Sequence, residues 1–139
     1  MKTSFSLIFI CLFINTAFAQ NTENDFQSDP VKVLEEVFRA AAKEDFSNLH
    51  LLCPEDKSND GDTQKYICDV AAASEQEKRE FVNYFKSGKI TGEAVISTSL
   101  SGVQVAKVPF WFNHPGGESR ANETMNLIRI EGKWYLSSF

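Results

Sequence analysis

The segment that most constrains the fold is the run of alternating apolar and polar residues from Ile90 to Phe139. β-branched and aromatic residues are frequent in it, and glycine marks each of its turns. Strands joined by turns this short run antiparallel. We therefore predict a four-stranded antiparallel β-meander, with strands over 90–100, 103–113, 119–130 and 133–139.

Alternation along these strands predicts which side chains share a face. The first strand should be half-buried, with Ala94, Ile96 and Leu100 on one side. In the longest strand Pro109 lacks a ladder donor, which predicts a bulge or an unpaired edge stretch there. One side of that strand carries Ala106, Val108, Phe110 and Phe112, and the other carries Val105, Pro109 and Trp111.

The register of the last hairpin is left open by the sequence. A two-residue loop at Glu131-Gly132 places Leu127 opposite Leu136, whereas a three-residue loop with a bulge places Ile128 opposite Trp134. A slip of one residue exchanges the two faces. The residues whose direction therefore stays undetermined are Glu123, Asn126 and Arg129.

Residues 1–19 have the form of an export signal, with Lys2, an apolar run and small residues at Ala17 and Ala19. The apolar run is too short for a retained membrane span. We expect cleavage between Ala19 and Gln20, and a soluble periplasmic or extracellular protein. The polar segment 20–28 predicts a flexible leader, and 29–139 predicts a single domain.

The charge of the mature chain limits its partners. Removal of Lys2 with the signal changes the formal net charge from −5 to −6. A negative surface disfavours binding to nucleic acid or to an anionic membrane. We therefore expect neither partner.

Cys53 and Cys68 are the cysteines that remain after signal removal. In an exported chain, an isolated pair that closes a short polar loop predicts a disulfide. The alternative is a redox or metal-binding pair, but the spacing is not Cys-x-x-Cys and no histidine cluster accompanies it. The loop from Asp56 to Asp62 imitates the start of a calcium loop, yet Ile67 stands where a bidentate glutamate is needed. We predict no metal site.

A first helix is predicted to begin at Asp29-Pro30, which has the pattern of an N-cap followed by proline at the first helical position. Apolar residues then recur at helical spacing, while charged residues fall mostly away from that stripe. One face should therefore pack against the sheet. The apolar positions are Val31, Leu34, Val37, Phe38 and Ala41.

Further helical segments are predicted before the meander. A short helix over 46–52 should be capped by Ser47, and residues 63–73 again show helical spacing. Ser74-Glu-Gln-Glu77 is a capping box, which starts another helix that runs to about Lys86. The fold class is therefore α+β, with N-terminal helices packed on the meander.

This order of elements resembles the nuclear transport factor two-like superfamily, also called cystatin-like, and within it a group of uncharacterised exported bacterial domains. The resemblance includes the helix at Asp29-Pro30-Val31, the helix at Asp45-Phe46 and the terminal hairpin at Gly132-Lys133-Trp134. It implies a strongly bent sheet that forms a cone around the first helix, often with a pocket at the open end. No catalytic motif of the superfamily is present, so no catalytic residue is carried over.

Two function classes are compatible with this sequence. The first is a non-catalytic module that binds a small apolar ligand or a protein partner. The consecutive aromatic residues of the longest strand favour it, because one face must pack on helices and the other lines a homodimer interface through the sheet or an exposed apolar patch. Trp111, Phe112 and Tyr84 are the residues that we predict to touch the ligand or partner.

The second class is a small cofactor-independent isomerase or dehydratase with its site in the cone. Such an enzyme needs a titratable group in a water-poor pocket. The candidate residues are Glu93, Glu123, His50 and Tyr84, and none has a partner at a defensible spacing. We therefore favour the binding module and expect no cofactor.

Overall fold

A computed structural model of the chain describes residues 25–114 and 120–139. The predicted export signal, its cleavage site, residues 20–24 of the predicted leader and the turn over 115–119 lie outside the described residues. The fold is α+β, with helices followed by an open antiparallel sheet. The α+β class and the antiparallel meander predicted from the sequence are thus confirmed.

The sheet has five strands where the sequence predicts four. Antiparallel pairing joins β3 to β4 and β4 to β5, and both β1 and β2 pair with the same edge of β3. Their bounds are β1 Lys89–Ile90, β2 Val95–Thr98, β3 Gln104–Asn113, β4 Arg120–Ile130 and β5 Lys133–Ser138.

Pro109 explains the extra strand. Its carbonyl accepts a hydrogen bond from the Thr91 N–H at 3.0 Å, but proline has no N–H to return. Residues 91–94 therefore separate β1 from β2, and the strand predicted over 90–100 becomes two short strands. The unpaired edge stretch predicted from Pro109 is present here.

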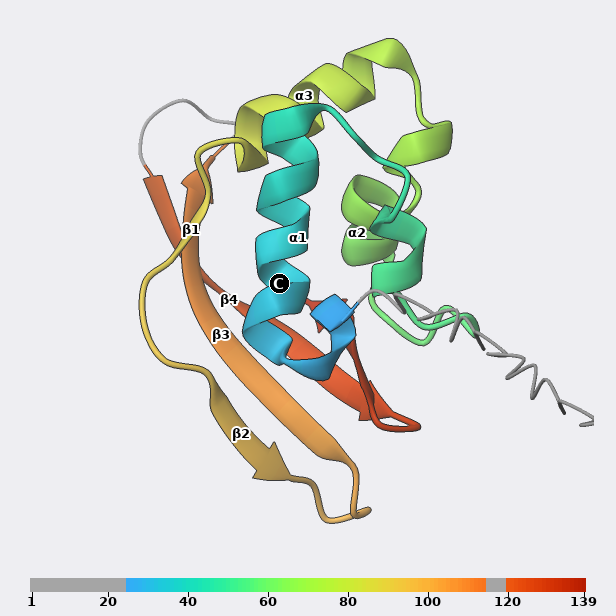
Figure 1. Cartoon of the computed structure of the whole chain (residues 1–139), viewed down its shortest axis with the longest axis vertical. Helices are drawn as coiled ribbons and strands as arrows, with labels where there is room; N and C mark the ends of the chain where they lie inside the picture. Colours follow the sequence, from blue (N-terminus) through green and yellow to red (C-terminus); the bar gives the residue numbers. More distant parts are fainter. Residues whose placement is uncertain (1–24, 115–119) are drawn as a thin grey trace, which may run out of the picture.

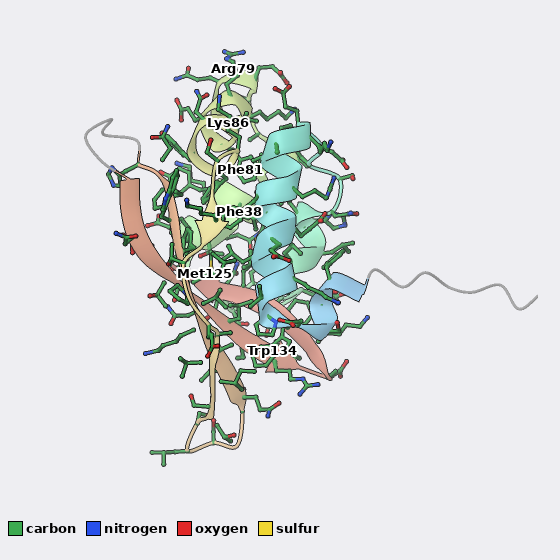
Figure 2. All side chains as sticks on the ribbon, turned by 60° about the vertical axis from the view of Figure 1, so that its left-hand side comes forward. Phe38, Arg79, Phe81, Lys86, Met125 and Trp134 are labelled. Carbon is green, nitrogen blue, oxygen red and sulfur yellow. A yellow bond between two sulfur atoms is a disulfide. The ribbon has the colours of Figure 1, made fainter. Side chains whose placement is uncertain are left out.

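The described helices all lie on one face of the sheet (Figures 1 and 2). The longest, α1, runs across the middle of that face, and α3 lies near one end of the strands (Figure 1). The helical elements are η1 Asp25–Ser28, α1 Pro30–Lys43, η2 Leu49–Leu52, α2 Gly61–Thr63, η3 Gln64–Cys68, η4 Val70–Ala72 and α3 Glu75–Phe85.

Both predicted starts of the long helices are confirmed. The Asp29 carboxylate accepts from the Val31 N–H at 2.8 Å, and Pro30 is the first residue of α1. The capping box before α3 is complete, because the Ser74 and Glu77 side chains each accept from the other residue's backbone N–H. These contacts satisfy N–H groups that have no partner within a helix.

The helix predicted over 46–52 is shorter than expected, and Ser47 does not cap it. Instead, the Asp45 carboxylate accepts hydrogen bonds from the Ser47 N–H at 3.2 Å and from its hydroxyl at 2.7 Å. Such a local side-chain turn competes with helix formation. The short helix η2 therefore begins only at Leu49.

The core lies between α1, α3 and the covered face of the sheet. Figure 2 shows Phe81, Phe38, Met125 and Trp134 in succession along it. Phe38 of α1 packs on Phe110 of β3, with ring centroids 6.0 Å apart. The predicted alternation of β3 is confirmed on this side, where Ala106, Val108, Phe110 and Phe112 are buried.

The final hairpin adopts the two-residue register. Leu127 pairs with Leu136, and both are buried. The turn residues Glu131 and Gly132 have φ of 49° and 83°, as the tight hairpin turn with two positive φ angles requires. Arg129, whose direction the sequence leaves open, pairs across the strands with Trp134.

The disulfide predicted from the cysteine pair joins Cys53 to Cys68, and both residues are buried. Cys53 directly follows η2, and Cys68 ends η3. The bridge therefore holds η2 against η3, as predicted for the second and third helical segments of the sequence. In the loop between them, Asp56 accepts from the Ser58 N–H and Asp60 accepts from the Thr63 N–H, so both carboxylates stabilise local turns.

The predicted leader over 20–28 has a structured end. Residues 25–28 form the turn η1, in which Phe26 packs against the core and Gln27 donates to the Leu51 carbonyl at 3.0 Å. No helix within the described ranges is long and apolar enough to cross a membrane.

Candidate ligand-binding site

A hollow of about 390 Å³ opens where α3, the α2–η3 segment and the ends of β3 and β5 meet. Its size falls within the range of about 300–1,000 Å³ typical of small-molecule sites. Most of its lining residues are aromatic, and we call it the aromatic hollow. It is lined by Asp62, Tyr66, Glu80, Tyr84, Phe85, Phe112, His114 and Phe139.

Stacked rings from three elements form the buried side of the aromatic hollow. Phe85 of α3 and Phe112 of β3 are almost fully buried, and their ring centroids lie 5.5 Å apart with planes 18° from parallel. Phe139 meets both rings edge-on, at 6.3 Å from each. Each aromatic pair in such a geometry stabilises the fold by about 0.5–1.5 kcal/mol in addition to the contribution of its buried apolar area. This side is therefore a rigid apolar wall.

Helix α3 supplies the polar side chains nearest to that wall. Glu80 and Tyr84 are four residues apart, so they lie on the same face of the helix, one turn from each other. Burial raises the pKa of the Tyr84 phenol, and electrostatic repulsion from Glu80 and Tyr66 raises it further. The hydroxyl of Tyr84 therefore stays protonated at neutral pH and can act as a hydrogen-bond donor.

The opposite side of the hollow comes from the segment that the disulfide fixes. Tyr66 lies in η3, two residues before Cys68. Asp62 lies in α2, and the preceding Asp60 donates its N–H to the Ser137 carbonyl of β5 at 2.8 Å. The disulfide and this hydrogen bond together hold the Asp62–Tyr66 side against the rest of the domain.

The structure brings together two of the three side chains predicted to touch a ligand. Tyr84 and Phe112 both line the aromatic hollow. Trp111 precedes Phe112 in the strand and therefore points to the opposite face of the sheet. There it is half-buried, with the Lys89 ammonium 5.5 Å from its ring centroid.

The acid–base candidates do not gather at one site. His50 is exposed on η2, Glu93 is exposed between β1 and β2, and Glu123 is exposed on β4 opposite Phe110. None of these three lines the aromatic hollow, whereas Tyr84 does. The described residues thus contain no pair of the predicted acid–base groups at this hollow.

The described residues that are buried and polar are Glu36 and Thr63. Glu36 accepts two hydrogen bonds of 2.7 Å from Arg39 and one of 3.2 Å from Asn48. The bonds with Glu36 raise the pKa of the Arg39 guanidinium above its ordinary value, and Arg39 therefore stays charged. Neither Glu36 nor Thr63 lines the aromatic hollow, and we interpret the Glu36 cluster as structural.

Most residues that line the hollow are not identified as site residues by the sequence. Tyr66 and Glu80 come from segments with a helical pattern, whereas Asp62, predicted to lie in the loop between the cysteines, lies in the short helix α2. Nothing in the helical pattern says which exposed positions share a cavity. One feature of the sequence could have identified Tyr66 as a site residue: it lies two residues before a cysteine of the predicted disulfide. His114 and Phe139 each follow the last residue of a strand.

A second hollow, of about 370 Å³, lies beside the start of α1 and is lined by residues such as Asp29, Ile96, Gln104 and Arg129. Arg129 donates to the Gln104 side chain at 2.7 Å and to the Gly132 carbonyl at 3.3 Å. The guanidinium of Arg129 and the side chain of Gln104 in this second hollow thus already have hydrogen-bond partners within the protein. Because the second hollow also lacks a stacked aromatic wall, we regard the aromatic hollow as the stronger ligand site.

No protein-family model matches this chain, and a search of curated proteins finds no match. Among the described residues, no group of three or more His, Cys, Asp or Glu side chains could hold a metal ion. The functional assignment therefore depends on the geometry of the aromatic hollow.

Proposed function

We propose that this protein is an exported, non-catalytic binding module that takes a small ligand with an apolar body into the aromatic hollow. The observation that carries the proposal is the hollow itself, which combines a rigid aromatic wall with the Tyr84 hydroxyl at its edge. Binding sites for small molecules are commonly apolar cavities with a few polar groups that orient the ligand.

Binding is favoured over the isomerase or dehydratase alternative because the space between α1 and the sheet, where that alternative places its site, is filled. Proton transfer needs a base in a water-poor position, usually with a second group that completes the reaction. The interior between α1 and the sheet is filled by side chains such as Phe38, Phe110 and Met125. A filled interior supports binding at the edge of the core, where the aromatic hollow lies.

We also propose that the chain has the bent, cone-like architecture of the nuclear transport factor two-like superfamily and is exported. The order of helices and antiparallel strands supports the first part, and the buried disulfide is compatible with the second. Mass analysis of protein secreted by the native host should find an N-terminus at Gln20. Native protein that retains Met1 would contradict export.

The binding proposal can be tested with tryptophol, a neutral indole alcohol, by isothermal titration calorimetry. We expect saturable binding to the purified protein. Tyr84→Ala should weaken it about 3- to 10-fold, which corresponds to the loss of one aromatic contact. Tyr66→Ala should have an effect in the same direction, because Tyr66 lines the other side of the hollow.

Trp111→Ala is the matched control, because it removes an aromatic side chain from the opposite sheet face. We expect it to leave tryptophol affinity unchanged. Loss of binding in Trp111→Ala, with full binding in Tyr84→Ala, would move the site to the outer sheet face. No binding to the wild-type protein would contradict the proposed function for apolar ligands of this size.

A further inference from the structure

Carboxylates supply the charge on the lining of the aromatic hollow. Its lining includes the carboxylates of Asp62 and Glu80, and no lysine or arginine side chain that the structure describes lines it. The remaining titratable side chains of the lining are Tyr66, Tyr84 and His114. The hollow therefore presents aromatic rings and negative charge together.

The two carboxylates come from different elements. Glu80 belongs to α3 and accepts a hydrogen bond from Gln76 at 3.0 Å, while Asp62 belongs to α2. Neither carboxylate forms a salt bridge with another described residue. Among the side chains that the structure describes, neither carboxylate is thus held in an ion pair.

The rings of the hollow can add to the attraction of a cation. An ammonium group within about 6 Å of an aromatic ring centroid is attracted by about 0.5–2 kcal/mol, depending on its exposure to water. Tyr66 already shows such a contact, because the Lys65 ammonium lies 4.9 Å from its ring centroid. Lys65 does not itself line the hollow.

We propose that the ligand of the aromatic hollow is a small amphiphile with an aromatic or aliphatic body and a protonated amine. The body would pack on Phe85, Phe112 and Phe139, and the ammonium would lie between Glu80 and Asp62. This inference rests on the proposed function and adds the chemical class of the ligand. Anionic ligands should be excluded, because they would meet two carboxylates beside an apolar wall.

Three indole probes that differ only in the group at the end of the side chain test this inference. Tryptamine carries an ammonium, tryptophol a hydroxyl and indole-3-acetate a carboxylate. By calorimetry, we expect tryptamine to bind the wild-type protein about 5- to 10-fold more tightly than tryptophol. Indole-3-acetate should bind more weakly than either. Added salt should weaken tryptamine binding more than tryptophol binding.

Glu80→Gln should weaken tryptamine binding more than tryptophol binding and so remove most of the preference for tryptamine, because the amide keeps the size of the side chain and removes its charge. Asp62→Asn should do the same to a smaller extent, because Asp62 is more exposed. Glu93→Gln is the matched control. It removes the same charge from an exposed position outside the hollow, so the tryptamine preference should persist.

The outcomes separate the two proposals. Equal affinities for tryptamine and tryptophol, unaffected by Glu80→Gln, would overturn the amine inference and leave the binding function intact. Failure of all three probes to bind would overturn both. A preference lost equally in Glu80→Gln and Glu93→Gln would show that overall charge, and not the hollow, attracts the amine, and would also overturn the inference.

Discussion

Apolar and polar residues alternate at both ends of the sheet, but the apolar side chains are buried at one end and exposed at the other. At the α3 end, Phe110 and Phe112 of β3 are at most 6% exposed. At the end formed by the β2–β3 hairpin, Ile96 is 52% exposed and Leu100 is fully exposed. Both ends have alternating apolar residues, so alternation alone does not determine burial.

The position of the helices explains the difference. Helices α1 and α3 cover the strands where Phe110 and Phe112 lie, while the β2–β3 hairpin projects past the first turn of α1 (Figure 1). The prediction that one face of the strand over 90–100 is buried is therefore wrong for Ile96 and Leu100. A period of two identifies a face, but a second layer must cover that face to bury it.

The largest expected contrast between the two ends is in stability. Phe110→Ala should lower the free energy of unfolding by about 3–5 kcal/mol, because it removes a fully buried ring that packs on Phe38. Ile96→Ala at the projecting hairpin should change it by less than about 0.5–1 kcal/mol. Urea denaturation followed by circular dichroism measures both. Equal losses would contradict the claim that only one end is covered.

Loss of the disulfide should affect the aromatic hollow and spare the hairpin. The double variant Cys53→Ala, Cys68→Ala should be destabilised by about 3 kcal/mol, the value expected for a loop of this length. The rate of amide hydrogen exchange, relative to the wild-type protein, should then increase most in η3, which carries Tyr66, and least along β2. Acceleration that is uniform over both regions would contradict a local role for the bridge.

A smaller effect is expected from the titration of Tyr84. Its pKa is raised in the folded state, so its stabilising contribution is complete below the ordinary pKa of about 10 and is lost as pH rises through the folded-state pKa. Ultraviolet difference titration of the wild-type protein and Tyr84→Phe would isolate this phenol. Glu80→Gln should lower the Tyr84 pKa toward its ordinary value. A Tyr84 that titrates below pH 10 would contradict the proximity of Glu80.

Local signals predicted much of the fold. Asp29-Pro30, the Ser74–Glu77 capping box and the Cys53–Cys68 pair each act over a few residues or one short loop, so the sequence reveals them. The sequence predicts only part of the break in the first strand. Pro109 identified the weak point, but the division into β1 and β2 depends on pairing with a distant segment.

The candidate site was harder to predict, because its residues are contributed by four separate segments. Tyr84 and Phe112, which the sequence predicts to touch a ligand or partner, both line one hollow. Trp111 was grouped with them, although adjacent residues of a strand point to opposite faces. Helical spacing places Glu80 and Tyr84 on one face of α3, but no sequence pattern brings Tyr66 close to them.

The most direct test of the ligand site is a titration of the isotope-labelled protein with tryptamine, followed by amide chemical shifts in NMR spectra. Binding in the aromatic hollow predicts that the largest shift changes occur around Asp62, Tyr66, Glu80, Tyr84 and Phe112. Residues of β2 and of the β2–β3 hairpin should remain unchanged. Shift changes concentrated on Val95–Thr98, or around Trp111 and Lys89 on the opposite sheet face, would contradict the assignment.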